Sequence, residues 1–178
     1  MDLQNTATEL FLGIDIGSTT AKIVLREGDT ILLERYERHF SQVREKTAEL
    51  LRLAKEIAGD KAVKAAISGS AGLGLAEAAH IPFVQEVFAT AQVVKLREPD
   101  TSCVIELGGE DAKIIFFKGG IDERMNGSCA GGTGAFIDQM ATLLNITVDE
   151  LDKLSLNAGR LYPIASRCGV FATTDIQP

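Results

Sequence analysis

The sequence predicts an α/β protein of two lobes that begin alike. Two strand–turn–strand patterns, residues 11–25 and 102–117, lie about ninety residues apart, and each turn carries an acidic residue and a lysine. Segments with the apolar period of a helix follow each pattern. A polar segment containing proline, residues 97–100, separates the halves. We therefore expect lobes at residues 1–98 and 99–178, each directing a turn at a shared cleft.

Composition and charge exclude several classes of protein. The chain has 178 residues, of which 46% are hydrophobic and 24% charged, as in a globular protein. A net charge of −7 without a Lys/Arg cluster argues against a nucleic-acid partner. The first residues lack the pattern of a signal peptide, and no apolar run approaches the roughly 18–20 residues of a membrane span. We expect a cytoplasmic protein with no membrane partner.

The first lobe is expected to open with three antiparallel strands and a helix. The second and third strands fall at residues 21–26 and 30–35, joined by a hairpin turn at residues 27–29. Ser41 is expected to cap the helix, and Gly59 is expected to end it. The helix should pack on the strands through one face. That face is predicted to contain Val43, Thr47, Leu50, Leu51, Ala54 and Ile57.

A short strand and two helices should complete this lobe. The strand is expected at residues 63–67, a small Ala-rich helix should end near His80, and a second helix should run from residue 86 to 95. His80 fits a helix end better than a ligand, because no second histidine or carboxylate pattern accompanies it. The same interpretation is given to His39.

The second half carries a glycine-rich stretch, residues 125–136, that leads into an apolar-faced helix. Cys129 lies in the approach to that helix, whose N-terminal dipole and free amides favour a thiolate or a phosphate. Thr147 and Glu150 have the spacing of a capping box for a further helix, expected to end at residues 157–159.

The end of the chain is expected to be strand-like over residues 164–172. Residues 173–175, Thr-Thr-Asp, have the composition of a cap for a helix that would follow. The second lobe is therefore expected to be incomplete.

The turn at residues 15–22 has the groups that a phosphate-binding site needs. Hydroxyls and glycine amides donate hydrogen bonds to phosphate oxygens, Lys22 adds a charge-assisted one, and Asp15 can hold a metal-bound water. A hairpin with a polar tip is the alternative for this stretch alone. The chain lacks the glycine spacings of a P-loop and of a dinucleotide fold. The second turn of similar layout favours the phosphate interpretation.

These motifs resemble those of one ATPase superfamily. Residues 15–22 resemble the first phosphate motif of acetate and sugar kinases, heat-shock chaperone ATPases and actin, and residues 106–113 resemble the second. Residues 126–134 and 166–171, which contain Cys129 and Cys168, are similar to the ATP-dependent activators of 2-hydroxyacyl-CoA dehydratases and the ATPase subunits of benzoyl-CoA reductase. The resemblance implies actin-like ATPase (ribonuclease H-like) lobes, the first followed by the start of the second.

The resemblance also implies site residues, with two departures from the family pattern. Glu106 stands where the family commonly has Asp, and Glu110 where it commonly has Gln, so the holding of water or magnesium and the ATPase rate are left open. The implied residues are, for catalysis, Asp15, Glu106 and Asp111; for the nucleotide, Gly17, Ser18, Thr19, Thr20, Lys22, Gly108, Gly109, Glu110, Lys113, Gly131, Gly132 and Thr133; and for the metal, Cys129 and Cys168.

The implied activity is ATP hydrolysis, with Mg²⁺, coupled to electron transfer through a [4Fe–4S] cluster between two subunits. The implied partners are a dehydratase or reductase that accepts the electron, a ferredoxin- or flavodoxin-like donor, and a second copy or tandem repeat. The cysteine count agrees, because such a cluster takes four thiolates and one chain offers three. Cys103, in an expected strand, is expected to be buried, which leaves two cysteines per chain. The alternative is that all three cysteines are buried thiols.

Two other functions are compatible with the same fold. A sugar or amino-sugar kinase would place a hydroxyl in line with the γ-phosphate, and an actin-like assembly module would open and close with the nucleotide. Iron content separates the activator from the kinase, and filament formation would indicate the module. The adenosine-binding elements of this superfamily lie downstream of the second phosphate motif, so this chain alone is expected to bind ATP no tighter than about millimolar, or ~4 kcal/mol.

Overall fold

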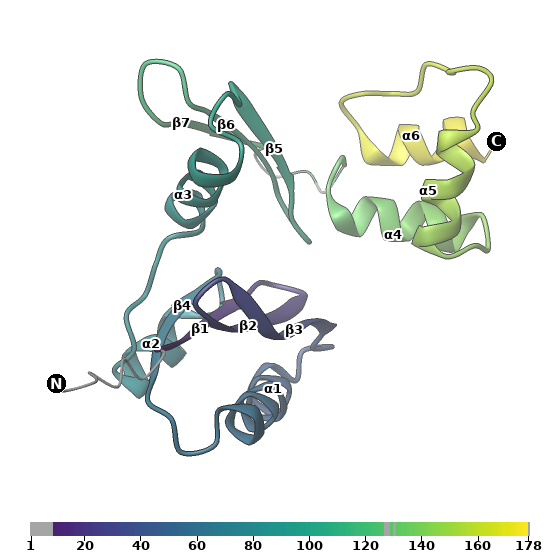
Figure 1. Ribbon diagram of the computed structural model, residues 1–178. Helices are drawn as coiled ribbons and strands as arrows, with labels where there is room; N and C mark the ends of the chain where they lie inside the picture. Colours follow the sequence, from purple (N-terminus) through teal and green to yellow (C-terminus); the bar gives the residue numbers. More distant parts are fainter. Residues whose placement is uncertain (1–8, 127–128, 130, 178) are drawn as a thin grey trace, which may run out of the picture. The chain divides into compact units, whose positions relative to one another are not determined.

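The computed structural model describes residues 9–126, 129 and 131–177, and its contacts divide the chain into two compact units, Met1–Leu96 and Arg97–Pro178 (Figure 1). Each unit has a sheet of its own. The division falls at the polar, proline-containing segment.

The first unit is built on a four-stranded sheet with the order β3-β2-β1-β4. The first three strands pair antiparallel, as expected, and β4 pairs parallel with β1. Gly28 adopts a φ of +56° in the hairpin between β2 and β3, a conformation that glycine adopts without steric cost. The elements of this unit are β1 (Leu10–Ile16), β2 (Thr20–Glu27), β3 (Thr30–Arg38), α1 (Val43–Ala58), β4 (Val63–Ser68), α2 (Leu73–Ala79) and α3 (Glu86–Arg97).

The core of this unit lies between the sheet and α1. Alternate residues of β1 and β2 point to one face, and α1 packs against that face (Figure 1). Full burial of one Leu or Ile side chain contributes about 1.5–3 kcal/mol, so this layer stabilises the strand ends that carry the first turn. The buried apolar residues are Leu10, Ile14, Ile16, Ala21, Ile23, Leu25, Leu33, Leu50, Ala54, Ala58, Ile67 and Ala76.

Two expectations for α1 were wrong. The N-cap is Gln42, without a side-chain hydrogen bond, because Ser41 adopts a left-handed conformation with a φ of +64°. Ile57, expected on the buried face, is 47% exposed. Ala58 is buried instead, because it lies four residues after the buried Ala54 and so on the same face of the helix. Gly59 ends the helix at a positive φ, as expected.

The second unit pairs β5, β6 and β7 into an antiparallel sheet in that order, and three helices follow in the chain. Strand β7 was not expected, because its four residues are all exposed and show no apolar alternation. The elements are β5 (Cys103–Leu107), β6 (Ala112–Phe116), β7 (Asp122–Met125), α4 (Gly134–Leu143), α5 (Val148–Leu156) and α6 (Gly169–Ile176).

The end of the chain corrects the sequence prediction. Residues 157–168 form neither helix nor strand, and α6 occupies the segment expected to be strand and cap. Thr173 and Thr174 lie inside α6, where their hydroxyls donate to the carbonyls of Gly169 and Val170 at 2.8 and 3.0 Å. Such bonds satisfy the threonine hydroxyls inside a helix, and within the described ranges no strand pairs with this segment.

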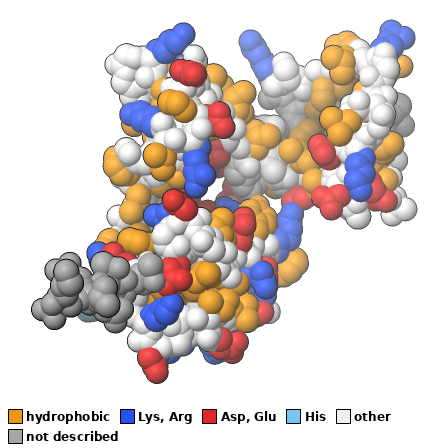
Figure 2. Space-filling view, viewed as in Figure 1, with side chains coloured by type: hydrophobic (Ala, Val, Ile, Leu, Met, Phe, Trp, Pro, Cys, Tyr) orange, Lys and Arg blue, Asp and Glu red, His pale blue; other side chains and the backbone are white. Residues whose placement is uncertain are grey.

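The described part of the chain contains no helix long and apolar enough to cross a bilayer. On the face drawn in Figure 2, Lys and Arg side chains are dispersed among Asp and Glu rather than gathered in one patch.

Candidate nucleotide and cysteine sites

The first turn joins β1 to β2 and carries an acid and a lysine at facing positions. Asp15 lies directly opposite Lys22 in the strand register. Because facing residues of antiparallel strands are close, the Lys22 ammonium reaches Asp15 Oδ2 at 2.5 Å, and it lies 5.3 Å from the centre of the Tyr36 ring. The lysine expected to bind phosphate is thus held beside the carboxylate expected to hold metal-bound water.

The other oxygen of Asp15 is a candidate group for binding a water or an ion. Asp15 Oδ1 is buried and makes no hydrogen bond to any group that the structure describes. A buried carboxylate oxygen without a partner is costly, so such an atom indicates a water, an ion or a ligand beyond the protein. Carboxylate oxygens are ligands that Mg²⁺ prefers, often through bound water, and Asp15 therefore fits this ion.

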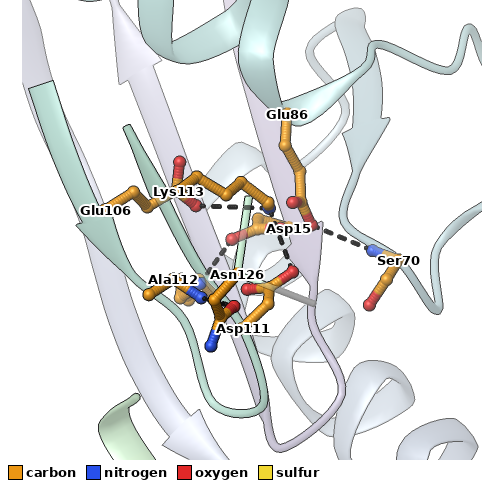
Figure 3. A network of polar contacts seen from close by, with 9 residues as sticks. Asp15, Ser70, Glu86, Glu106, Asp111, Ala112, Lys113 and Asn126 are labelled. Carbon is orange, nitrogen blue, oxygen red and sulfur yellow. Dashed lines mark hydrogen bonds and ion pairs between the residues drawn. The ribbon is translucent and has the colours of Figure 1, made fainter. Parts of the chain in front are cut away.

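The loop after β4 closes against this carboxylate. Gly69 has a φ of +94°, and a Cβ at this position would lie 2.2 Å from the Ile16 carbonyl oxygen and 2.5 Å from Asp15 Oδ1. Only glycine allows so close an approach. The neighbouring Ser70 N–H donates to Glu86 Oε1 at 3.0 Å, which holds the loop against the start of α3 (Figure 3).

The second turn joins β5 to β6 and repeats the pairing of acid and lysine. Lys113 lies opposite Glu106 in the register, and its side chain is only 8% exposed. Its ammonium lies 3.4 Å from Asp111 Oδ2 and 3.8 Å from Glu106 Oε1 (Figure 3). A buried ammonium requires such partners, because desolvation without a counter-charge is costly. The cation is therefore oriented by the two acids that the sequence predicted for catalysis.

The start of α4 is joined to the second turn. The Gly108 N–H donates to the Asp111 carbonyl at 2.8 Å and closes the turn. The first N–H groups of the helix, from Gly134 and Ala135, donate to the carbonyls of Gly108 and Gly109 at 2.7 and 3.1 Å. A change in the shape of this turn therefore acts directly on the helix terminus, where backbone donors lack intrahelical partners.

Cys129 and Cys168 belong to segments that meet in the second unit. The Gly131 N–H donates to Cys129 Sγ at 3.3 Å, and the pKa of Cys129 is lowered by the backbone hydrogen bonds from Gly131 and from Gly169, the residue after Cys168. Backbone donors stabilise the thiolate, which is the form that binds metal. The sequence placed Cys129 at the start of α4, whereas the structure gives it a donor at the start of α6.

Asn126 is a connecting residue that sequence reasoning did not select. Its side chain accepts from the Ala112 N–H and donates to the Cys129 carbonyl, both at 2.8 Å. It therefore connects the residue after Asp111 to the segment of Cys129; Figure 3 shows Asn126 beside Ala112. Asn126 is the first residue of the cysteine motif at residues 126–134, and this position could have identified it from the sequence.

The other predicted residues differ in accessibility. Thr133 is fully buried and caps α4 by accepting from the Phe136 N–H at 3.4 Å, which is a structural role. Cys103 is exposed, so its expected burial was wrong. Ser18, Glu110 and Gly132 are exposed, and Thr19 is half-buried. Gly127, Ser128 and Ala130 of the cysteine motif lie outside the described residues.

In each of two hairpin turns on mixed α/β units, a lysine pairs with a carboxylate across the hairpin, and the fold is that of an actin-like ATPase. The chain belongs to the BadF/BadG/BcrA/BcrD ATPase family, which residues 12–177 match.

Relatives of the chain are named as activators of enzymes that act on CoA substrates. It is 30% identical over 175 residues to the 2-hydroxyisocaproyl-CoA dehydratase activator of Clostridioides difficile, a match that covers 93% of this chain and 64% of the relative. It is 33% identical over 171 residues to the activator of lactoyl-CoA dehydratase of Anaerotignum propionicum, covering 93% and 65%. The chain thus spans less than two thirds of the length of these relatives.

Two solved structures share the fold. The activator of the 2-hydroxyisocaproyl-CoA dehydratase from Clostridium difficile with bound ADPNP matches with a TM-score of 0.78 and 29% identity over 93% of this chain and 63% of its own. Component A of the Acidaminococcus fermentans (R)-2-hydroxyglutaryl-CoA dehydratase matches with a TM-score of 0.74 and 28% identity over 94% and 66%.

Proposed function

We propose that this chain belongs to an ATP-driven activator that passes an electron, through a [4Fe–4S] cluster shared between two subunits, to a dehydratase or reductase acting on a CoA substrate. The family and the names of the relatives support the ATPase and the class of partner. The observation that carries the cluster is the bonding of Cys129: backbone N–H groups from Gly131 and Gly169 both reach its sulfur, so the two cysteine segments are adjacent.

The two turns supply the nucleotide part of this proposal. Asp15, with its unpartnered oxygen, is suited to orient a magnesium-bound water, and Lys22 and Lys113 bring positive charge to the phosphates. Gly17, Ser18 and Thr19 offer backbone and hydroxyl donors, and this type of turn is suited to bind a nucleotide phosphate. Hydrolysis then depends on positioning more than on covalent chemistry. The adenosine contacts belong to the part of the family that this chain does not span.

The thiols fit a shared cluster. Among the described residues no group of three or more His, Cys, Asp or Glu side chains could hold a metal ion, so one chain does not bring together a complete set of ligands. Cys129 and Cys168 from two chains, or from two repeats, would provide four thiolates. When bound, the cluster would supply one-electron chemistry at low potential. The amides around Cys129 stabilise the thiolate and favour an electron-rich sulfur environment.

The proposal includes three protein partners and two alternatives. A ferredoxin- or flavodoxin-like protein would donate the electron, the dehydratase or reductase would accept it, and the subunits would form a homodimer or a tandem-repeat dimer. A sugar kinase or an actin-like assembly module would give no role to the paired cysteine segments, and no contact among the described residues favours either one.

The test is anaerobic reconstitution of the complete protein with iron and sulfide. We expect about four iron atoms per dimer, loss of most iron uptake in Cys129→Ser and in Cys168→Ser, and retention in Cys103→Ser. Cys103 is the matched control, because it is an exposed cysteine in the same unit. Full iron binding by a protein that lacks both Cys129 and Cys168 would overturn the cluster assignment.

A further inference from the structure

His39 is a buried histidine that lies between β3 and α1 and contacts the first turn. Its side chain is 4% exposed. Its Nε2 lies 3.1 Å from the Gly17 carbonyl oxygen, and its Nδ1 accepts from the Ser41 N–H at 3.2 Å. Its own backbone N–H donates to the Thr19 carbonyl at 3.2 Å. Backbone and side chain of one residue therefore hold two carbonyls of the turn.

The partners determine the tautomer of the ring. A backbone N–H only donates, so Nδ1, which faces the Ser41 N–H, must be the unprotonated acceptor. A carbonyl oxygen only accepts, so Nε2 must carry the proton that it donates to Gly17. In this arrangement Nδ1 accepts and Nε2 donates, so both ring nitrogens are used. A charged imidazole would place two donors against each other at Ser41.

The segment after His39 is bent to make these contacts. Phe40 and Ser41 have φ values of +47° and +64°, a conformation that is unfavourable for two consecutive residues other than glycine. The bend is held by the Gln42 N–H, which donates to the His39 carbonyl at 2.7 Å, and by the bond from Ser41 to Nδ1. The ring is thus fixed from the side opposite the turn.

Holding the Gly17 carbonyl sets the direction of the next amide. The Gly17 carbonyl and the Ser18 N–H belong to one planar trans peptide, in which the two groups point in opposite directions. When the carbonyl points at His39, the Ser18 N–H points away from the core, toward the exposed side of the turn. The Gly17 N–H donates to the Thr20 carbonyl at 2.9 Å, so the turn is closed in this orientation.

We propose that His39 is a positioning residue for the phosphate turn: by donating from Nε2 to Gly17, it presents the Ser18 amide to a nucleotide phosphate. The inference rests on the proposed function, since it assigns the turn to phosphate. A residue that merely filled the core would use its volume, whereas this role requires a donor at the position of Nε2.

Two substitutions separate the two ring nitrogens. His39→Gln keeps a donor near the position of Nε2 and loses the acceptor for Ser41, whereas His39→Asn keeps the acceptor near Nδ1 and loses the reach to Gly17. Each removes one hydrogen bond, but Asn is the smaller side chain, so a purely structural role would lower the free energy of unfolding more in His39→Asn while leaving MgADP affinity unchanged in both variants. His80→Gln is the control, because His80 is exposed and caps α2.

The experiment measures MgADP binding to the complete protein by calorimetry and exchange of the Gly17 amide by NMR. We expect His39→Asn to weaken MgADP about tenfold and to accelerate Gly17 exchange, with His39→Gln within about threefold of wild type in both. Equal effects of the two variants, or ring ¹⁵N shifts showing protonation at Nδ1, would overturn the proposal. If wild type failed to bind MgADP, the proposed function would fail, while Gly17 exchange in the two variants would still decide the role of His39.

Discussion

Both turns have the same arrangement of charged residues. In each, a lysine faces a carboxylate across a hairpin, with Lys22 against Asp15 in the first and Lys113 against Glu106 in the second. Glu106 Oε1 lies 3.8 Å from the Lys113 ammonium. The second turn therefore pairs its lysine with a glutamate, where the first uses an aspartate.

Asp15 should matter for hydrolysis more than for affinity. Asp15→Asn keeps the size of the side chain and removes the charge that would orient magnesium-bound water. In the complete protein we expect turnover to fall by ~10²-fold or more, with MgADP affinity little changed. Steady-state phosphate release and calorimetry measure the two effects.

Asp29→Asn is the control for this substitution, because Asp29 is exposed in the hairpin between β2 and β3. Hydrolysis near the wild-type rate in Asp15→Asn would reduce Asp15 to a turn residue that pairs with Lys22.

Sequence reasoning identified the chemistry of the turns but not the residues that orient them. Asp15, Lys22, Asp111 and Lys113 stand within a few residues of one another in each motif, so local spacing was enough to select them. His39 reaches Gly17 across 22 positions, and such a contact depends on how β3 and α1 close. Ser41 was predicted to cap the helix because of its residue type, whereas in the structure its backbone N–H donates to His39 Nδ1.

Among the elements, α5 begins where a local sequence pattern alone predicts it. Thr147 and Glu150 form the expected capping box: the Thr147 hydroxyl accepts from the Glu150 N–H at 3.2 Å, and Glu150 Oε2 accepts from the Thr147 N–H at 2.7 Å. The pKa of Glu150 is lowered first by the bond from the Thr147 N–H and then by the Thr147 hydroxyl, which donates to Glu150 Oε2 at 2.9 Å.

Removing this cap should weaken α5 in a pH-dependent way. Because the pKa of Glu150 is lowered in the folded state, its stabilisation is complete above the usual carboxyl pKa and is lost as the pH falls through the lowered value. Thr147→Ala should destabilise α5 by about 1 kcal/mol at neutral pH, and the difference from wild type should shrink in acid. Amide exchange in α5 at several pH values measures this.

Ser155→Ala is the control, since Ser155 lies in the same helix and its hydroxyl donates to the Asp152 carbonyl. A pH-independent effect of Thr147→Ala would contradict the role given to Glu150.

The elements that sequence reasoning missed lack such local signals. Helix α6 contains Val170, Phe171 and two threonines, residue types that favour strands when a neighbour is present to pair with them. Strand β7 has no apolar residue to bury except Met125, and it is defined by its pairing with β6. Both depend on the presence or absence of a partner strand, which residue patterns do not specify.

For the whole molecule, the family match extends over residues 12–177, whereas the matched relatives are longer than this chain. The second turn and the cysteines lie in one unit, connected through Asn126 and through the start of α4. Under the proposed function, ATP binding favours electron donation. If ATP favours donation by making the reduced protein less stable, reciprocal linkage requires the nucleotide to shift the equilibrium between the oxidised and reduced protein.

The reduction potential of the reconstituted dimer, titrated with MgADP and then with a nonhydrolysable MgATP analogue, tests the coupling of nucleotide to electron transfer most directly. A coupling of 1–3 kcal/mol corresponds to a shift of roughly 40–130 mV for one electron. We expect a lower potential with the ATP analogue and no redox signal in Cys129→Ser. Identical potentials with both nucleotides bound, as verified by calorimetry, would contradict the account.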